Sequence, residues 1–405
     1  RTIFGGKGNT MSYEFKDKFA IVGLGVTKVG HMPDYSARTL QTEAARLAIE
    51  DAGLKAKDID GAINSLADGS GGTPGMWTDA FPRVLGLPVK FYFNLARGGA
   101  VAALSLITAT RFLEMGLANY VVVAYGSDDW SRMHKGKDQV LMPVRKKGVW
   151  GDCLGELTAA SFHSQFASRH MFEYGTTSRQ LGMVAVSERK WACLNPAAYL
   201  YGRPITIEDH QTSAVLVWPY HLLDYSLVSD GGTAFVITTA ERAKGLRKPP
   251  VYIMGFGSGE QMRKLWWDKE NYTQLDVAPS KEAAFKMAGI ELKDIDVAQF
   301  YDCFTAEVIF QLEDYGWCKK GEGGPFVEAG NIMPGGTIPV NTGGGLLCSH
   351  HHLDFTPMAE GVIQMRGEGG DRQVKNAEIC QVSGHGGEII KPGMCSIHTT
   401  TILRR

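Results

Sequence analysis

The fold is decided by two stretches of the chain, ARLAIEDAGLKAKDID at residues 45–60 and KEAAFKMAGIELKDID at residues 281–296. In each, an amphipathic pattern runs to an Ala-Gly pair that ends in Gly53 or Gly289. Glycine there is a common helix stop, because it accepts the left-handed backbone that ends the last turn. A Lys-Asp-Ile-Asp phrase and an apolar run follow in both copies. The pattern predicts helix, turn and strand twice over, and so indicates an internal duplication.

Further segments extend the repeat in both directions. Apolar runs at residues 61–66 and 297–301 predict a strand after each copy. The runs FAIVGLGVT (19–27) and VYIMGFGSG (251–259) predict a strand at the start of each half. Because strands alternate with helices throughout, the sequence predicts an α/β fold.

The expected boundaries follow from the repeat. Residues 1–10 precede Met11, and we expect them to be an expression remnant outside the folded unit. The first half then covers residues 11–247, and a Lys-Pro-Pro seam opens the second half, residues 248–405. Residues 130–215 break the symmetry as an insertion of loops and helices, and long insertions usually carry binding surfaces.

Composition excludes several classes of function. The chain has 405 residues and a formal net charge of −1, so no strong field attracts nucleic acid or an anionic membrane. No apolar run approaches the roughly 18 residues that span a bilayer. The seven cysteines form no Cys-x-x-Cys pair, so we expect no metal site in this chain. Their odd number fits a reducing compartment, and we expect a cytoplasmic protein.

Four longer phrases carry a resemblance to a known family. They are MFEYGTTSRQLGMVAVSERKWACLNPAA (171–198), SDGG (229–232), YDCFT (301–305) and NTGGG (341–345). Together with the repeat they resemble the thiolase superfamily, and most of all its sterol-carrier-protein-type thiolases and steroid side-chain-cleaving aldolases. The resemblance implies a thiolase fold, with duplicated αβαβα halves in a five-layer core, and a dimer.

The sequence departs from thiolases at the nucleophile. In the family a cysteine opens a C-x-x-G phrase at the start of a buried helix, where the helix dipole favours the thiolate. Here Ala96 takes that position. The region of the second family cysteine, residues 382–387, reads VSGHGG and also lacks cysteine. Covalent acyl-enzyme chemistry of the usual kind is therefore not expected.

Other motif positions keep residues capable of acid–base chemistry. Where thiolases carry an Asn-Glu-Ala-Phe phrase, this chain has Tyr301, as the family aldolases do. By spacing, His351 falls near a second aldolase tyrosine, and His350 near the histidine of the thiolase Gly-His-Pro phrase. Which histidine acts as base stays open. The predicted catalytic set is Tyr301, His351, His350, His385 and Asp302, and the predicted coenzyme A-binding glycines are Gly344, Gly345, Gly386 and Gly387.

These residues suit a retro-aldol reaction. A β-hydroxyacyl thioester can be cleaved without a protein nucleophile if a base takes the hydroxyl proton and donors hold the enolate oxygen. Tyr301 with His351 or His350 is assigned the first role. A remaining histidine and the glycine turn at 384–387 are assigned the second. The acyl group expected from the resemblance alone is a steroid side chain.

The resemblance also implies partners. Aldolases of this branch pair with a small OB-fold protein that carries a zinc ribbon, of the domain-of-unknown-function 35 (DUF35) type. We therefore expect a heterotetramer of two thiolase-fold chains and two OB-fold chains. Coenzyme A is expected as part of the substrate, and zinc only in the partner.

Two other functions stay open. A Claisen-type thiolase could use a displaced nucleophile, for which Cys348 is the candidate because it lies near the glycine-rich turn. A non-catalytic subunit would explain the loss of both family cysteines. Asp302 also has a second interpretation, as a brace for the turn after its strand rather than a catalytic group.

Overall fold

The computed structural model describes residues 15–65, 80–134, 159–260, 272–386 and 397–405. Nine strands form one sheet in the order β3-β2-β4-β7-β1-β8-β11-β10-β9. These strands are β1 (Phe19–Val26), β2 (Gly61–Asn64), β3 (Tyr92–Asn94), β4 (Tyr120–Asp128), β7 (Asp230–Thr239), β8 (Val251–Glu260), β9 (Val297–Gln299), β10 (Ile379–Gly386) and β11 (Ile397–Arg404). A two-stranded hairpin of β5 (Val215–Val217) and β6 (Tyr220–His221) begins where the insertion ends.

The order of the strands shows the duplication. In the first half β2 runs parallel to β4, and β7 pairs antiparallel with both β4 and β1. In the second half β9 runs parallel to β10, and β11 pairs antiparallel with both β10 and β8. The half-sheets meet where β1 pairs with β8 through Ala20–Tyr252 and Ile21–Val251.

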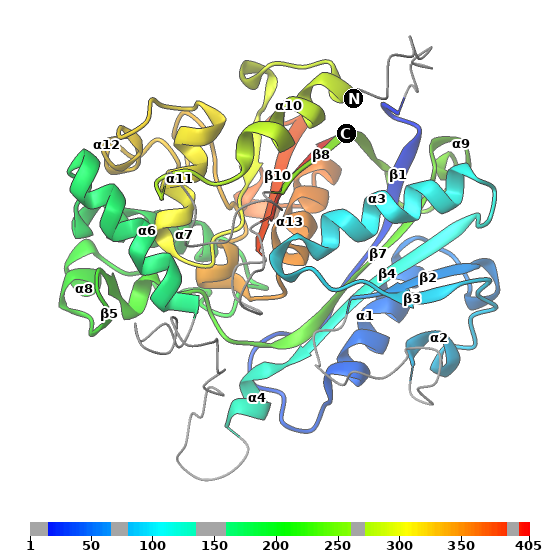
Figure 1. Ribbon diagram of the computed structural model, residues 1–405. Helices are drawn as coiled ribbons and strands as arrows, with labels where there is room; N and C mark the ends of the chain where they lie inside the picture. Colours follow the sequence, from blue (N-terminus) through cyan, green and yellow to red (C-terminus); the bar gives the residue numbers. More distant parts are fainter. Residues whose placement is uncertain (1–14, 66–79, 135–158, 261–271, 387–396) are drawn as a thin grey trace, which may run out of the picture.

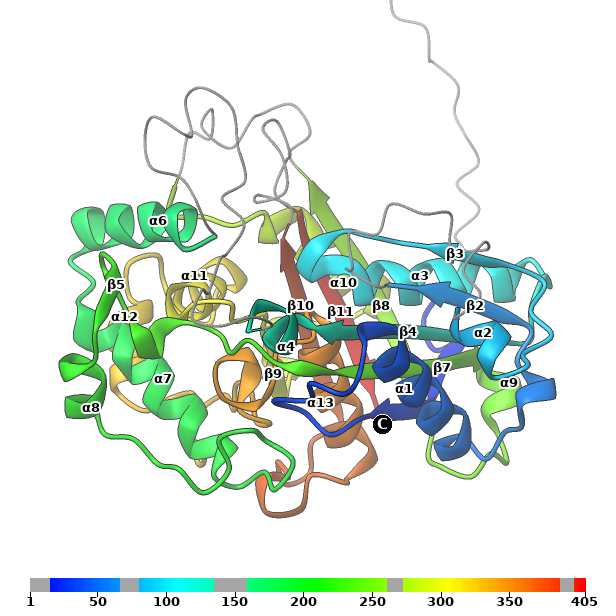
Figure 2. The same ribbon diagram turned by 90° about the horizontal axis from the view of Figure 1, so that it is seen from below.

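The helices form three layers around the two half-sheets. The helices are α1 (Ala37–Asp51), α2 (Phe81–Val84), α3 (Val101–Glu114), α4 (Asp129–Met133), α6 (Ala159–Tyr174), α7 (Ser178–Ala192), α8 (Ile207–Thr212), α9 (Ala240–Ala243), α10 (Val277–Ala288), α11 (Thr305–Tyr315), α12 (Gly323–Glu328) and α13 (Phe355–Arg366). Helix α1 packs on the first half-sheet and α10 on the second, while α3 and α13 contact each other and strands of both halves. Figure 2 shows α3 and α1 on opposite sides of β4. The core therefore has the five αβαβα layers of the predicted thiolase fold.

Glycines allow each outer helix to lie close to its strand. A side-chain carbon at Gly25 would overlap the Ala44 carbonyl oxygen of α1, and one at Gly257 would overlap the Ser280 carbonyl oxygen of α10. Such close approach of a backbone is possible only without a side chain. A strand glycine thus lies against the outer helix at the corresponding position in both halves.

The repeat forms the predicted elements, with shorter strands. Helix α10 ends at the left-handed Gly289 (φ 65°), and Gly53 (φ 73°) follows α1 in the same conformation. The strand predicted over 297–301 ends at Gln299, because the Phe300 N–H donates to the Asn341 side chain instead of to a strand (2.7 Å).

The insertion builds a separate group of helices. Helices α6, α7 and α8 lie beside α11 and α12, at the side of the molecule away from β2 and β3 (Figure 1). Among the described residues, no helix is long and apolar enough to cross a membrane.

Candidate active site

The turn between β9 and α11 carries Tyr301. The Tyr301 N–H donates to the Ser383 hydroxyl on β10 (3.0 Å), and the Gln311 amide on α11 donates to the Tyr301 carbonyl oxygen (2.8 Å). The Ser383 hydroxyl in turn donates to the Gln311 amide oxygen. This closed ring of hydrogen bonds fixes the backbone of Tyr301 and so the starting point of its buried side chain.

A glycine turn of the first half lies against Tyr301. A side-chain carbon at Gly99 would overlap both the Tyr301 ring and the His385 carbonyl oxygen, and one at Gly386 would lie 2.5 Å from the Gly99 nitrogen. Both glycines are therefore needed for the halves to meet here. Ala96 stands three residues earlier, where it is exposed and offers only a methyl group.

A carboxylate from the second half closes the start of helix α3. Asp354 accepts hydrogen bonds from the backbone N–H groups of Ala102 (2.8 Å) and Ala103 (2.9 Å). Burial raises the pKa of Asp354 to about 7, against the lowering effect of these backbone donors. Two of the free amides at the start of this helix are thus already occupied by a carboxylate. Sequence reasoning missed Asp354, and the 252 residues between it and Ala102 leave no local signal.

The three consecutive histidines point to three different places. The Tyr301 hydroxyl lies 3.4 Å from His351 Nε2, at the outer limit of a hydrogen bond, and the Ser229 hydroxyl accepts from the His351 backbone N–H (2.9 Å). His350 instead contacts Ser349 and lines a cavity of about 120 Å³ to which neither Tyr301 nor His351 contributes. His352 is fully buried against the Thr233 hydroxyl (2.9 Å). Of the three, His351 is the one placed beside Tyr301.

Burial sets the protonation of these rings. It lowers the pKa of His351 and lowers the pKa of His350 to about 4. Asp129 acts in the opposite direction on His351. Both imidazoles are therefore neutral at pH 7, the form that can accept a proton.

Asp302 lies under the glycine-rich turn. It is fully buried and accepts from the backbone N–H groups of Leu346 (2.9 Å) and Leu347 (3.0 Å). A side-chain carbon at Gly345 would overlap its carboxylate, and burial raises the pKa of Asp302. This geometry favours the interpretation of Asp302 as a brace, because none of these contacts leads to Tyr301.

The remaining predicted residues are divided between two places. His385 lies near the end of β10, between Gly384 and the final residue Gly386, and a carbon on either glycine would crowd the Gly98–Gly99 turn. Strand alternation sends the His385 ring to the opposite face, where it lies 5.8 Å from the His398 ring, centroid to centroid.

Gly344 packs against Ala192 of α7, and so belongs with Gly345 to the turn over Asp302. Gly387 lies outside the described residues. Contact of these glycines with coenzyme A stays a prediction.

Known proteins of similar sequence and structure bear on these positions. A family model described as thiolase C-terminal domain-like matches residues 259–405. A Thermomonospora curvata protein named steroid side-chain-cleaving aldolase is 35% identical, over 86% of this chain and 90% of its own. The chain belongs to the thiolase superfamily. A Mycobacterium tuberculosis protein named 17-hydroxy-3-oxo-4-pregnene-20-carboxyl-CoA lyase is 34% identical, over 86% of this chain and 91% of its own.

A solved structure places the chain within the superfamily more narrowly. The structure titled "Ltp2-ChsH2(DUF35) aldolase" superposes with a TM-score of 0.84 and 32% identity, over 96% of this chain and 98% of that one. With the two relatives, it places the chain in the aldolase branch of the thiolase superfamily.

The displaced thiolase nucleophile is poorly placed for its task. Cys348 is buried, and burial raises the pKa of its thiol to about 11, although Arg189 Nε lies 3.3 Å from the sulfur and acts to lower it. A thiolase needs a thiolate at neutral pH. The thiol of Cys348 would be protonated there, which weakens the Claisen alternative.

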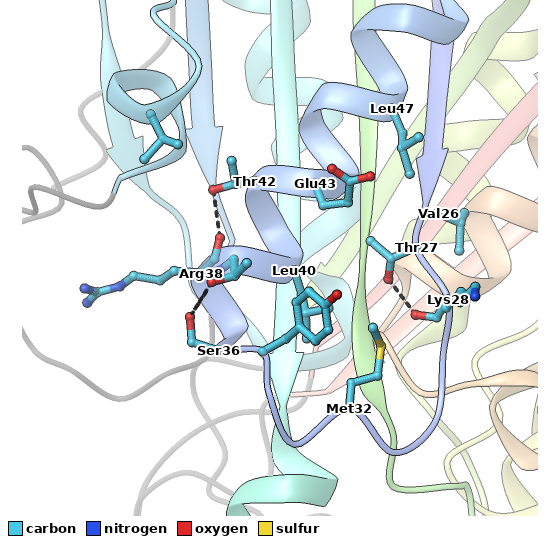
Figure 3. A pocket seen from close by; sticks show the side chains of 13 residues that line it. Val26, Thr27, Lys28, Met32, Ser36, Arg38, Leu40, Thr42, Glu43 and Leu47 are labelled. Carbon is cyan, nitrogen blue, oxygen red and sulfur yellow. Dashed lines mark hydrogen bonds between the residues drawn. The ribbon is translucent and has the colours of Figure 1, made fainter.

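A wide surface cavity of this thiolase-fold chain borders the smaller cavity at His350, since Val26 and Thr27 line both. It encloses about 780 Å³ between the end of β1 and helix α1, with Thr27, Lys28 and Arg38 among its lining residues (Figure 3). None of the predicted site residues lines it.

Proposed function

We propose that this chain is an acyl-CoA carbon–carbon lyase that cleaves a 3-hydroxyacyl-CoA by a retro-aldol reaction. The observation that carries the proposal is one junction between the halves. There the Tyr301–His351 pair of the second half lies beside a first-half turn that has Ala96 in place of a nucleophile. The occupied start of helix α3 supports the same conclusion, since a thiolate would gain little from it. The names of the aldolase and lyase relatives agree with this reaction class.

In the proposed step Tyr301 and His351 remove the β-hydroxyl proton. The bond between the α and β carbons then breaks, and the β carbon becomes a ketone or an aldehyde. The electron pair of the broken carbon–carbon bond passes to the thioester side and forms the enolate of a shorter acyl-CoA. We assign the enolate oxygen to backbone amides of the glycine turns that meet at Gly99 and Gly386, since such amides can hold a developing oxyanion.

The substrate and partner are proposed from the relatives. Both curated relatives are named for steroid chemistry, so we propose a steroid side chain bearing a β-hydroxyl as the acyl group. The similar solved structure includes a DUF35 protein in its title, which supports a small OB-fold partner here. We propose that this chain forms a homodimer and, with that partner, a heterotetramer.

The test is a product analysis. The chain is incubated with 3-hydroxyacyl-CoAs, with and without a DUF35 protein, and the mixture is analysed by mass spectrometry. We expect equal amounts of a carbonyl product and a shorter acyl-CoA, and no acyl group on the protein. An acyl adduct on any cysteine would contradict the proposal.

A further inference from the structure

Two histidines of helix α6, seven residues apart, each pair with a glutamate of helix α11. His163 Nδ1 is hydrogen-bonded to Glu307 Oε1, and His170 Nε2 to Glu313 Oε2 (2.8 Å). All four side chains are buried. The two pairs share their helices and their chemistry, so each serves as a reference for the other.

The pair at His170 is closed by further contacts. His170 Nδ1 bonds the Thr176 hydroxyl (2.8 Å), and Glu313 also accepts from the Gly323 N–H (2.9 Å) and lies 3.1 Å from Lys320 Nζ. Buried polar groups with complete partners of this kind stabilise a fold. The His170–Glu313 pair is therefore structural.

The carboxylate of the His163 pair has fewer contacts than that of the His170 pair. Glu307 Oε2 is buried and has no hydrogen-bond partner among the described residues. Leaving a buried atom of this kind unpaired destabilises a fold, so it calls for an explanation beyond packing. A carboxylate with one oxygen on an imidazole can hold that ring in one orientation and balance its charge.

The His163 pair flanks the same turn as the proposed base. The His163 ring lies 4.9 Å from the Phe304 ring, centroid to centroid. The Cys303 sulfur lies within 4.8 Å of a ring nitrogen of His163 and of a carboxylate oxygen of Glu307. The His163 ring is also 6.1 Å from the His385 ring. The four-residue turn 301–304 thus has His351 at its first residue and His163 at its last two.

A retro-aldol reaction needs two proton transfers. One base takes the hydroxyl proton, and after the carbon–carbon bond breaks an acid must protonate the α carbon of the enolate. The second family cysteine, a candidate for such a transfer, is absent from residues 382–387. Tyr301 and His351 are already assigned to the hydroxyl proton, so the enolate carbon needs a donor of its own.

We infer that His163, oriented by Glu307, is the acid that protonates the enolate carbon. This inference rests on the proposed lyase function. A ring N–H of His163 gives its proton to the α carbon, the enolate electron pair forms the new carbon–hydrogen bond, and the thioester carbonyl returns. The proton taken from the β-hydroxyl passes to solvent, and solvent reprotonates His163, so the cycle neither gains nor loses a proton.

The same three groups also form a donor set of the kind that binds zinc. The direct bond from His163 Nδ1 to Glu307 argues against it, because it joins two atoms that an ion would hold apart. Stoichiometric zinc in the active protein, lost on replacing Cys303 with alanine, would overturn the assignment of His163 as an acid.

The test separates the two proton transfers, in a preparation that cleaves a 3-hydroxyacyl-CoA. Acetyl-CoA and propionyl-CoA are incubated in deuterated buffer, and exchange of their α protons is followed by mass spectrometry. This exchange forms and reprotonates the enolate without breaking a carbon–carbon bond. We expect His163→Gln to slow it about 100-fold. His170→Gln is the matched control and should retain exchange within about threefold, as a structural position does.

Tyr301→Phe gives the converse result, because it should lower cleavage by about 10²–10⁴ and slow exchange much less. If His163→Gln does not fold, Glu307→Gln tests the same point, since it should shift the pH profile of exchange while Glu313→Gln does not. Exchange in His163→Gln or Glu307→Gln that matches the wild type in rate and pH profile would overturn the inference. Absence of cleavage in the wild type would instead refute the proposed function.

Discussion

The two halves of the chain share a scaffold and differ in chemistry. Strands β2-β4-β7-β1 of the first half correspond to β9-β10-β11-β8 of the second, and Gly25 and Gly257 admit the outer helices in the same way. At the junction, however, the first half contributes a bare glycine turn, and the second contributes Tyr301, His351 and Asp354. Duplication has preserved the packing in both copies, while Tyr301 and His351, the groups assigned to the β-hydroxyl proton, belong to the second half alone.

The largest expected effect comes from removing that chemistry. Tyr301→Phe and His351→Ala should each lower the turnover of a 3-hydroxyacyl-CoA by about 10²–10⁴, because each removes a group that handles the β-hydroxyl proton. Steady-state kinetics by product formation measures the effect. Wild-type rates in both variants would contradict the claim that the second half supplies the groups that handle the β-hydroxyl proton.

The pH profile sharpens the same comparison. Because burial lowers the pKa of His351, its neutral form persists below pH 6.5. The acid limb of kcat/KM should therefore lie below pH 6.5 and disappear in His351→Ala. A limb that stays in place in this variant would show that another group is the base.

A smaller effect is expected where the halves touch. Gly99→Ala would force a carbon into the Tyr301 ring and the His385 carbonyl oxygen, and should lower the free energy of unfolding by about 1–3 kcal/mol. Gly116→Ala, just beyond the other end of helix α3, meets open space and serves as control, although its φ of 69° makes it cost up to about 1 kcal/mol. Urea unfolding measures both. Equal losses would mean that the junction is looser than described.

His350 tests the separation of the histidines through stability. Its pKa falls to about 4 on folding from an ordinary 6.5, so the unfolded chain binds its proton first as the pH drops. Stability from this group is complete above pH 6.5 and is lost toward pH 4, by about 3 kcal/mol. His350→Gln should remove this dependence of stability on pH. Asp354 contributes a dependence of the opposite sign in both proteins, so subtracting one stability–pH curve from the other cancels it. Unfolding at pH 4.5, 5.5 and 7 supplies the data, and parallel curves would contradict the burial of His350.

The smallest effect is expected where the family places its nucleophile. Ala96→Cys should give no acyl adduct with labelled acyl-CoA in intact-mass spectrometry, because Asp354 already occupies the start of α3 and leaves little to lower a thiol pKa. A stable adduct on the new cysteine would show that the first half is still competent for thiolase chemistry.

Much of this molecule could be predicted from local patterns. The repeat at 45–60 and 281–296 indicates the α/β duplication. The family motifs predict Tyr301 together with His351 or His350, and the structure brings Tyr301 close to His351. The positions of the His350 and His352 side chains could not be predicted. The side chains of consecutive residues point in different directions, and the backbone path after the glycine turn decides which of them faces Tyr301. The His163–Glu307 pair joins helices 144 residues apart, and no periodicity signals such a contact.

The central layer has a consequence for how such a chain could arise. Helices α3 and α13 pack against each other and bury apolar side chains such as Val101, Leu106, Phe355 and Met358 between the two half-sheets. A single half on its own would present one of these helices to water as an apolar face. An ancestor of half the length would therefore have needed a second copy of itself to cover that face, and gene fusion would have made the pairing permanent.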